Sequence, residues 1–184
     1  YSPNETKNSK SKKARLNFNN IFDIDRSGQN DLVESGQSFT LGFEYEKINN
    51  KNNNTFLNMG FATVFRDKKN FDLPTQTSLG QKTSDIVGVF NLKPSKFFDI
   101  NYEYSIDNNL DQINYNNIST NISVNNLVTS FEFLEENKHI GENSYLKNKT
   151  TYNFNENKSF SFETSRDLKK DLSEYYKLIY EYKN

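Results

Sequence analysis

The sequence contains no cysteine and only one histidine among its 184 residues. The absence of cysteine excludes a disulfide-stapled scaffold and a zinc site built on thiolates. A single histidine leaves a histidine-rich metal site, or a catalytic triad, with only one possible member of that kind.

Charge of one sign is also lacking, because 23 basic residues stand against 24 acidic ones and the net charge is −1. This balance argues against a nucleic-acid-binding surface, which needs a net basic patch. No stretch approaches the roughly 20 apolar residues of a membrane-spanning helix. No leader typical of a signal peptide is visible, and the chain starts without Met and stops directly after a strand-like run, so we interpret it as an internal part of a longer protein.

Hydrophobic residues are scarce at 33%, and the mean hydropathy is −0.91. These values alone would suggest disorder. However, the chain contains 16 Phe and 11 Tyr, whereas disordered segments are poor in aromatic residues, and it also contains 30 Asn and only three Pro. The fold must therefore use a very polar and a very aromatic set of side chains together.

The dominant pattern is an alternation of apolar and polar residues with a period of two, which is typical of β-strands. No helical period persists for long, and the tyrosines near the end of the chain favour strand. Ten runs carry the alternation: 14–22, 36–47, 55–66, 84–92, 97–106, 113–124, 127–135, 145–154, 158–167 and 174–182. Residues 1–13 are polar and basic and predict a loop or a frayed start.

The seven clearest runs have one face without any charged residue, and most of its members are Phe, Tyr, Ile, Leu or Thr. The opposite face carries nine charges among small and amide residues: Glu44, Glu46, Arg66, Asp99, Glu103, Glu132, Glu163, Lys177 and Glu181. The run 84–92 is ambiguous because Val87 and Val89 lie on its polar side, and the run 145–154 has Asn148 on its apolar side.

The connections between the runs tend to alternate in length. The long ones are 23–35, 67–83, 107–112, 136–144 and 168–173, and the short ones are 48–54, 93–96, 125–126 and 155–157. Short connections join antiparallel neighbours. An up-and-down meander would place all the long loops at one end of the sheet and the tight turns at the other.

Three features favour a membrane barrel over a soluble sandwich. Most runs are about 9–12 residues long, near the length of a tilted transmembrane strand. Long loops at one end and short turns at the other are the outer-membrane pattern. The polar face is too polar for a dry core and suits a water-filled lumen. The predicted fold class is therefore all-β, an antiparallel up-and-down transmembrane β-barrel wall, with about ten strands of a larger closed barrel.

This fold assigns each candidate side chain to lipid or to water. The expected lipid-facing residues are Phe43, Phe61, Tyr102, Phe131, Phe162 and Tyr180. The expected lumen-facing residues are Glu44, Asn58, Arg66, Asn101, Glu103, Glu132, Glu163, Lys177 and Glu181.

Several segments resemble the translocon barrel of the LptD family of lipopolysaccharide-assembly proteins. They are YSPN (Tyr1–Asn4), DIDRSGQNDLVESGQSFTLGFEYE (Asp23–Glu46), and the late strands Ser84–Asp107 and Glu174–Asn184. The family pattern of an Asn/Asp-Arg pair, a Gly, an acidic residue and a polar run into a Thr-x-Gly strand matches Asp25, Arg26, Gly28, Asp31, Glu34, Gln37, Thr40, Leu41, Gly42 and Tyr45. One departure is Leu32, where the family usually has Arg.

The resemblance covers nearly the whole chain and implies transport rather than catalysis. LptD-like proteins form a very large barrel in the outer membrane of Gram-negative bacteria and hold a lipoprotein plug, LptE. Lipopolysaccharide reaches them over a periplasmic bridge and jellyroll, and enters the outer leaflet through a lateral opening. The implied partners are thus an LptE-like lipoprotein, lipopolysaccharide, the periplasmic bridge and membrane lipids, with no nucleic acid and no cofactor. Residues 1–184 would be a partial barrel domain, without the jellyroll, the Cys-bearing segment or the final strands.

A calcium loop is a competing interpretation of residues 23–34. Asp23, Asp25, Ser27, Gly28 and Glu34 match positions 1, 3, 5, 6 and 12 of an EF-hand loop, whose oxygens surround a sharp glycine turn. The flanking residues are strand-like rather than helical, and Asn30 stands where an apolar residue is usual. An outer loop whose acidic residues cap turns is the favoured alternative, so we predict no metal site here.

Two other functions compete with transport. A small barrel enzyme would place His139 near a carboxylate such as Glu135, Glu136 or Glu142 at the rim, although a solvated loop histidine is the expected state. A soluble, Asn-rich β-sandwich would serve as a binding module. The basic patch Ser9–Lys13 could meet anionic lipid, but a solvated segment is the simpler interpretation.

Overall fold

A computed structural model describes residues 14–27, 34–49, 54–139 and 141–183 of the chain. One short 3₁₀ helix, η1, spans Ser78–Gly80. The strands are β1 (Ser38–Asn49), β2 (Asn54–Arg66), β3 (Ile86–Ser95), β4 (Phe98–Ile106), β5 (Ile113–Val124), β6 (Leu127–Glu136), β7 (Asn143–Asn155), β8 (Lys158–Asp167) and β9 (Leu172–Tyr182). No helix in the described part of the chain has the length and apolar character needed to cross a membrane.

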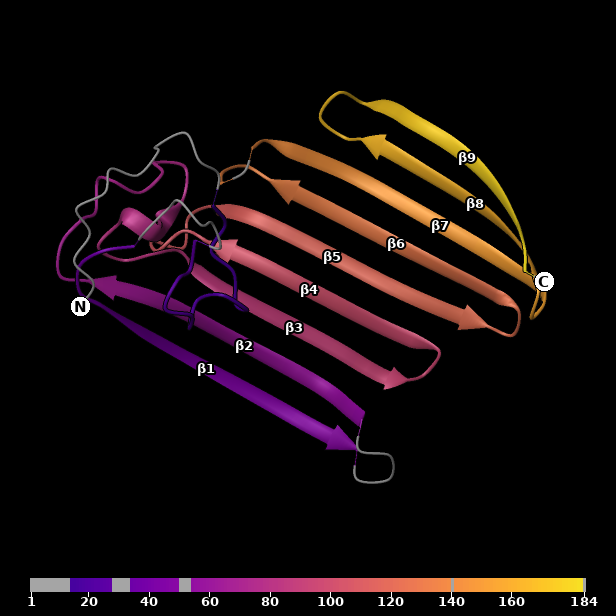
Figure 1. Cartoon of the computed structure of the whole chain (residues 1–184), viewed down its shortest axis with the longest axis horizontal. Coiled ribbons are helices and arrows are strands. Elements are labelled where there is room, and N and C mark those ends of the chain that lie inside the picture. Colours follow the sequence, from indigo (N-terminus) through magenta and orange to yellow (C-terminus); the bar gives the residue numbers. More distant parts are fainter. Residues whose placement is uncertain (1–13, 28–33, 50–53, 140, 184) are drawn as a thin grey trace.

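The nine strands form one antiparallel sheet in chain order, β1 to β9, with every strand paired to its sequence neighbours (Figure 1). This confirms the predicted all-β, up-and-down architecture. The connections β2–β3, β4–β5, β6–β7 and β8–β9 lie at one end of the sheet, while the turns β3–β4, β5–β6 and β7–β8 lie at the other. β1 and β9 are the edges, so the described strands form an open wall rather than a closed barrel.

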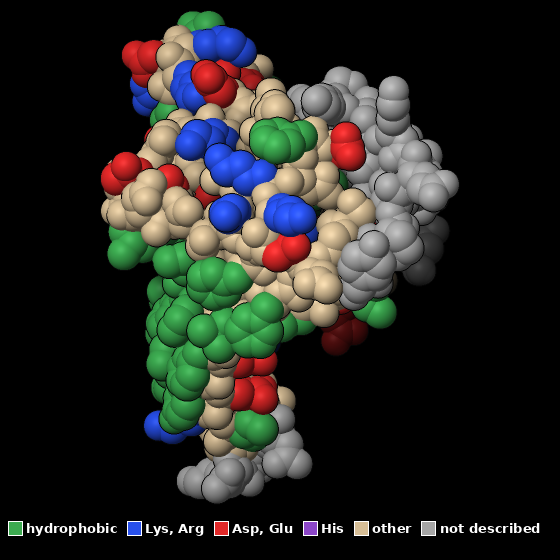
Figure 2. Space-filling view, turned by 90° about the vertical axis from the view of Figure 1, so that its left-hand side faces the viewer, with side chains coloured by type: hydrophobic (Ala, Val, Ile, Leu, Met, Phe, Trp, Pro, Cys, Tyr) green, Lys and Arg blue, Asp and Glu red, His purple; other side chains and the backbone are tan. Residues whose placement is uncertain are grey.

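The register keeps like faces together across the whole sheet. Phe43 pairs with Phe61, Tyr102 with Ile118, and Phe162 with Leu178. Opposite them, Asn91 pairs with Asn58 and with Asn101. Figure 2, which looks onto the long-loop end, shows hydrophobic side chains on one side of the sheet and acidic ones on the other, below the loops. We call these sides the apolar face and the polar face.

The run 14–22 is not a strand, so nine of the ten predicted runs form strands in the described chain. The side chain of Asn17 accepts hydrogen bonds from the backbone amides of Asn19 and Asn20, both at 3.0 Å. In return, Asn20 Oδ1 accepts from the Asn17 amide at 2.9 Å, and the Ile21 amide donates to the Asn17 carbonyl at 3.1 Å. Asparagine side chains that bond to nearby backbone compete with a strand ladder, which folds this segment into turns.

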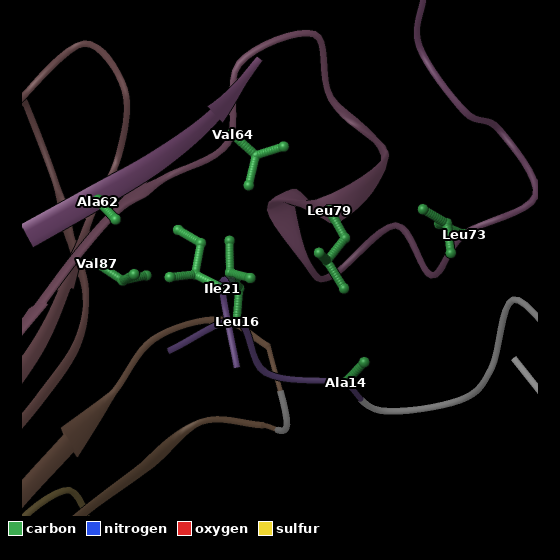
Figure 3. Close-up of a cluster of buried hydrophobic side chains, with 8 residues drawn as sticks. All are labelled: Ala14, Leu16, Ile21, Ala62, Val64, Leu73, Leu79 and Val87. Carbon is green, nitrogen blue, oxygen red and sulfur yellow. The ribbon is translucent and has the colours of Figure 1, made fainter. Parts of the chain in front are cut away.

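The turn-rich segment lies on the polar face at the long-loop end, together with the β2–β3 loop. We call residues 14–27 and 67–85 the cap. Its buried side chains form the main apolar cluster of the described chain with β2 and the start of β3 (Figure 3): Ala14, Leu16, Ile21, Ala62, Val64, Leu73, Leu79 and Val87. This cluster explains why the run 84–92 was ambiguous, because Val87 is buried on the face that is otherwise polar.

Two glycines bring the cap close to the sheet. A Cβ at Gly60 would lie 2.3 Å from Cζ of Phe18, and a Cβ at Gly42 would lie 2.6 Å from Cζ of Phe22. Only glycine leaves room for these rings against the strand backbone. At the long-loop end, the small residues of the polar face therefore make room for aromatic side chains of the cap.

Leu16→Ala is expected to loosen the cap without disturbing the sheet. Leu16 is 1% exposed, and truncating a buried leucine typically costs about 2–5 kcal/mol. Hydrogen exchange should therefore be faster at the amides of residues 14–27 and unchanged in β5–β8. Ile24→Ala is the control, because Ile24 is fully exposed and its truncation should leave the exchange rates as they are. Equal effects of the two substitutions would contradict the packing described above.

Candidate functional site

The apolar face carries all six residues predicted to contact lipid. Phe43, Phe61, Phe131, Phe162 and Tyr180 are 38–61% exposed, and Tyr102 lies half-buried against Tyr104 with ring centroids 5.4 Å apart. Soluble monomers rarely expose an apolar surface that extends over a whole sheet. The described part of the chain forms a single nine-stranded sheet, and no second sheet of these residues covers this face.

The polar face carries all nine residues predicted to face water. Eight of them, from Glu44 on β1 to Glu181 on β9, are exposed or half-buried. Their partners are polar: Asn58 Nδ2 donates to Glu44 Oε1 at 2.8 Å, and Tyr175 donates its hydroxyl to Glu163 Oε1 at 2.7 Å. Arg66 lies on the same side of β2 but is buried under the cap. The open part of the polar face is thus a hydrated surface of carboxylates, amides and lysines.

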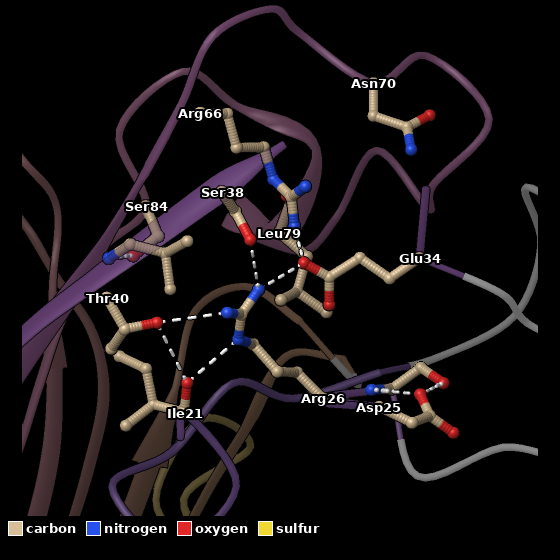
Figure 4. Close-up of polar contacts among 12 residues, drawn as sticks. Ile21, Asp25, Arg26, Glu34, Ser38, Thr40, Arg66, Asn70, Leu79 and Ser84 are labelled. Atoms are coloured by element: carbon tan, nitrogen blue, oxygen red, sulfur yellow. Dashed lines mark hydrogen bonds and ion pairs between the residues drawn. The ribbon is translucent and has the colours of Figure 1, made fainter. Parts of the chain in front are cut away.

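A buried charge cluster joins the cap to the sheet (Figure 4). The carboxylate of Glu34 forms ion pairs with the guanidinium groups of Arg26 and Arg66, and all three side chains are at least nine-tenths buried. Arg26 also donates to Ser38 Oγ at 3.2 Å and to Thr40 Oγ1 at 3.0 Å on β1. Burial lowers the pKa of Arg26, and the neighbouring carboxylate offsets that loss of hydration by pairing with the charged form.

The cluster groups residues that the sequence named for different reasons. Arg26 and Glu34 belong to the motif that resembles LptD, whereas Arg66 was predicted as an isolated lumen charge. Arg66 also donates from Nε to the Leu79 carbonyl at 2.6 Å, which ties the β2–β3 loop to the same point. Removing one partner of a buried ion pair leaves an uncompensated charge, so the three residues act as one structural unit.

A second ion pair fixes the other side of the cap and was missed by sequence reasoning. Arg15 Nη2 lies 2.8 Å from Oε1 of Glu136 on β6, and its guanidinium carbon lies 4.2 Å from the ring centroid of Tyr115 on β5. Residues 14–27 therefore cross the polar face from β1 to β6. No local signal marks this pair, because its members are 121 positions apart.

His139 is buried at 1% exposure, so the expectation of a solvated loop histidine was wrong. Its Nε2 lies 3.3 Å from Oδ2 of Asp85, and its backbone amide donates to the Gln76 carbonyl at 3.2 Å. The same Asp85 oxygen accepts from Asn114 Nδ2 at 2.8 Å and from Ser105 Oγ at 3.1 Å. The cluster ties the β6–β7 loop to the cap and to β4 and β5.

The partner of His139 differs from those that the sequence suggested for an enzyme site. None of the carboxylates imagined beside it is its partner here: Glu136 pairs with Arg15, and Glu142 lies 3.4 Å from Lys169. The partner that it does have, Asp85, is buried as well.

Two residues of the calcium interpretation, Asp25 and Glu34, bind protein groups in the structure instead. Glu34, the expected bidentate ligand, is held by two arginines, and Asp25 Oδ1 accepts from the amide and the hydroxyl of Ser27 at 3.0 and 2.6 Å. Gly28 and Asn30 lie outside the described residues, as do the patch Ser9–Lys13 and the motif Tyr1–Asn4. Within residues 14–27, 34–49, 54–139 and 141–183, no three acidic or histidine side chains gather as a metal site would require.

Asp85 predicts a dependence of stability on pH. Burial raises its pKa, but the neighbouring His139 ring and the hydrogen bonds from Asn114 and Ser105 outweigh burial, so the pKa lies below the ordinary 3.8. A lowered pKa in the folded state stabilises the fold above that ordinary value, and the contribution is lost as pH falls through the lowered one.

Asp85→Asn should therefore lower the free energy of unfolding by about 1–3 kcal/mol at pH 7, since hydrogen bonds to a charged acceptor are lost. The difference from the unmodified protein should shrink in acid, below the ordinary aspartate pKa of 3.8. Urea unfolding at a series of pH values measures both. A constant difference down to strongly acidic pH would show that the carboxylate charge is not what stabilises this cluster.

Comparisons with known proteins agree with the geometry. The family model described as LptD, LPS transport system D, matches residues 1–160. A comparison with individual curated proteins finds no match to the chain. The matched range includes β1 to β7, the start of β8, and the Arg26–Glu34–Arg66 cluster. A match over most of the chain, on a sheet with one apolar and one polar face, shows that the chain belongs to the LptD family of lipopolysaccharide transport proteins.

Proposed function

We propose that this sheet is part of the wall of a barrel in the outer membrane of a Gram-negative bacterium, where it helps to insert lipopolysaccharide into the outer leaflet. The apolar face contacts lipid. The polar face lines the lumen, through which the hydrated saccharide moves. The single observation that supports this proposal is the division of one sheet into an uncharged aromatic face and a hydrated, charged one.

Membership of a lipopolysaccharide transport family supports lipopolysaccharide as the transported molecule. Some aromatic residues lie toward the strand ends, with Phe39 and Phe65 toward the long-loop end and Tyr152, Tyr180 and Tyr182 toward the short-turn end, and their position supports the proposal. Aromatic girdles at both interfaces are typical of outer-membrane barrels. We extend the proposal to an LptE-like lipoprotein in the lumen and to delivery over a periplasmic bridge.

The two free edges belong to the same proposal. β1 and β9 each have one side without a strand partner in the described chain. Unpaired backbone groups cost several kcal/mol each in hydrocarbon, so further strands must pair with both edges to close the barrel. The described strands would then be a wall segment whose faces keep the roles given above.

Phe61→Arg should destabilise the membrane-inserted protein by about 2–4 kcal/mol, because it would place a charge in lipid near the middle of β2. Asn58→Arg is the matched control: it lies three residues away on the polar face, where Glu44 and Glu46 are near. Urea unfolding from lipid vesicles measures both variants. Equal cost at the two positions would mean that the apolar face does not contact lipid.

Depletion of the protein in its native host should lower the amount of lipopolysaccharide at the cell surface. The measurement is labelling of intact cells with a lipopolysaccharide-specific probe, with total lipopolysaccharide in lysates as the control. Surface labelling should fall while the total does not, because synthesis is separate from export. Unchanged surface display on depletion would argue that the chain has another role.

A further inference from the structure

We propose that the polar face of β5–β8 holds a subsite for an anionic sugar, a saccharide unit that carries a phosphate or a carboxylate, and that Lys147 and Lys149 bind its anionic group. This inference rests on the proposed function, because it names the part of the transported glycolipid that the lumen wall binds. The site is a hollow in the open part of the polar face, outside the region that the cap covers.

The hollow has the size and the chemistry of a sugar site. Its volume is about 520 Å³, within the usual range of roughly 300–1,000 Å³ for small-molecule sites. Its lining includes the polar side chains of Asn117, Asn121, Glu132, Lys147, Lys149 and Glu163. Amide and carboxylate groups can exchange hydrogen bonds with sugar hydroxyls, and ammonium groups bind phosphate or carboxylate oxygens.

The two lysines are available because the carboxylates opposite them have other partners. The register places Lys147 across from Glu132, and Lys149 across from Glu163. Opposite charges at such positions ordinarily pair. Yet among the described residues no carboxylate oxygen lies within the 4.0 Å of an ion pair from either ammonium group.

Tyrosine hydroxyls are what hold these carboxylates. Tyr145 donates to Glu132 Oε1 at 3.1 Å, and Tyr175 donates to Glu163 Oε1 at 2.7 Å. The Lys147 ammonium lies 4.1 Å from the centroid of the Tyr145 ring instead. The hollow therefore offers two ammonium groups that have no ion-pair contact among the described residues, next to two carboxylates that each accept a tyrosine hydrogen bond on one oxygen.

The charge distribution over the polar face favours this position for an anion. On β1–β4 the open polar face carries four carboxylates, Glu44, Glu46, Asp99 and Glu103, against one lysine, Lys93. On β6–β9 three carboxylates, Glu132, Glu163 and Glu181, are matched by three lysines, Lys147, Lys149 and Lys177. An anion that moves along the polar face is thus repelled less at the hollow on β5–β8 than over β1–β4.

The test uses photocrosslinking in cells that produce the protein. A p-benzoyl-phenylalanine at Asn121 reports on the hollow, and the same residue at Asn58 reports on the polar face outside it. The double substitution Lys147→Gln and Lys149→Gln should lower the yield of lipopolysaccharide crosslinked at Asn121 about tenfold, since charged hydrogen bonds are lost. Lys93→Gln, which removes a lysine beside a different hollow, should leave that yield unchanged.

A second variant keeps both lysines. Tyr145→Phe with Tyr175→Phe frees Glu132 and Glu163 to pair with the lysines, so the crosslink at Asn121 should fall although no positive charge is removed. Heat-dependent electrophoretic mobility checks that each variant is folded. A tyrosine variant with an undiminished crosslink would overturn the argument that the carboxylates are held away from the lysines.

The source of the anion is separated with the purified protein and two probes. Lipopolysaccharide should crosslink at Asn121 more strongly than the same material stripped of phosphate, and a carboxylated saccharide should compete in proportion to its charge. Competition by inorganic phosphate alone, with equal crosslinking of intact and stripped lipopolysaccharide, would reduce the site to a free-anion site and overturn the sugar assignment.

The outcomes also separate this inference from the proposed function. If lipopolysaccharide crosslinks at Asn58 and Asn121 and the lysine variant has no effect at either position, the subsite is wrong and the transport proposal stands. If neither position crosslinks in the unmodified protein, the proposed path along the polar face fails, and the subsite fails with it.

Discussion

The alternation of side chains along a β-strand is the constraint on which the rest of this structure depends. Successive residues point to opposite faces, so a single sheet can separate two environments only if every strand keeps the same register. The pairings Phe43–Phe61, Tyr102–Ile118 and Phe162–Leu178 maintain that register from β1 to β9. A slip by one residue would place carboxylates such as Glu103 among the aromatic side chains. The fold is therefore defined by the two faces of the sheet rather than by a central core.

The cap packs against one end of the same strands. At the long-loop end the polar face must hold residues 14–27 and 67–85, and it does so where its own side chains are small or apolar. Gly42 and Gly60 receive aromatic rings, and Val64 and Val87 supply apolar contacts. The Arg26–Glu34–Arg66 and Arg15–Glu136 pairs then fix the segment at β1, β2 and β6. On the polar face, the strands thus carry a buried apolar cluster at the long-loop end and an exposed polar surface along the rest.

On the exposed part of the polar face, the environment of each carboxylate depends on its hydrogen-bond partner as well as on its position in the sequence. Glu132 and Glu163 stand opposite lysines yet accept hydrogen bonds from tyrosines, and Glu44 accepts one from an asparagine. A carboxylate that accepts a hydrogen bond from a neutral donor keeps its charge without forming an ion pair with the lysine opposite. The polar face therefore carries separate charges of both signs.

The sequence by itself determined the architecture and the faces of the strand residues in the clearest runs. Period two, run length and the alternation of long and short connections are local properties, and they predicted nine of the strands and the faces of Phe43, Phe61, Glu44 and Asn58. The aromatic and carboxylate sides could be assigned in this way because each strand carries its own pattern.

Only the tertiary structure decided which distant residues meet. Asn17 and Asn20 turn an apparently alternating run into a docked segment, His139 is buried against Asp85 rather than solvated, and Arg66 pairs with Glu34. Lys147 lies over the Tyr145 ring, while Glu132 opposite it accepts a hydrogen bond from the Tyr145 hydroxyl. These contacts depend on the packing of loops and on competition between partners that are far apart in the chain, and a periodic pattern within one strand contains no information about either.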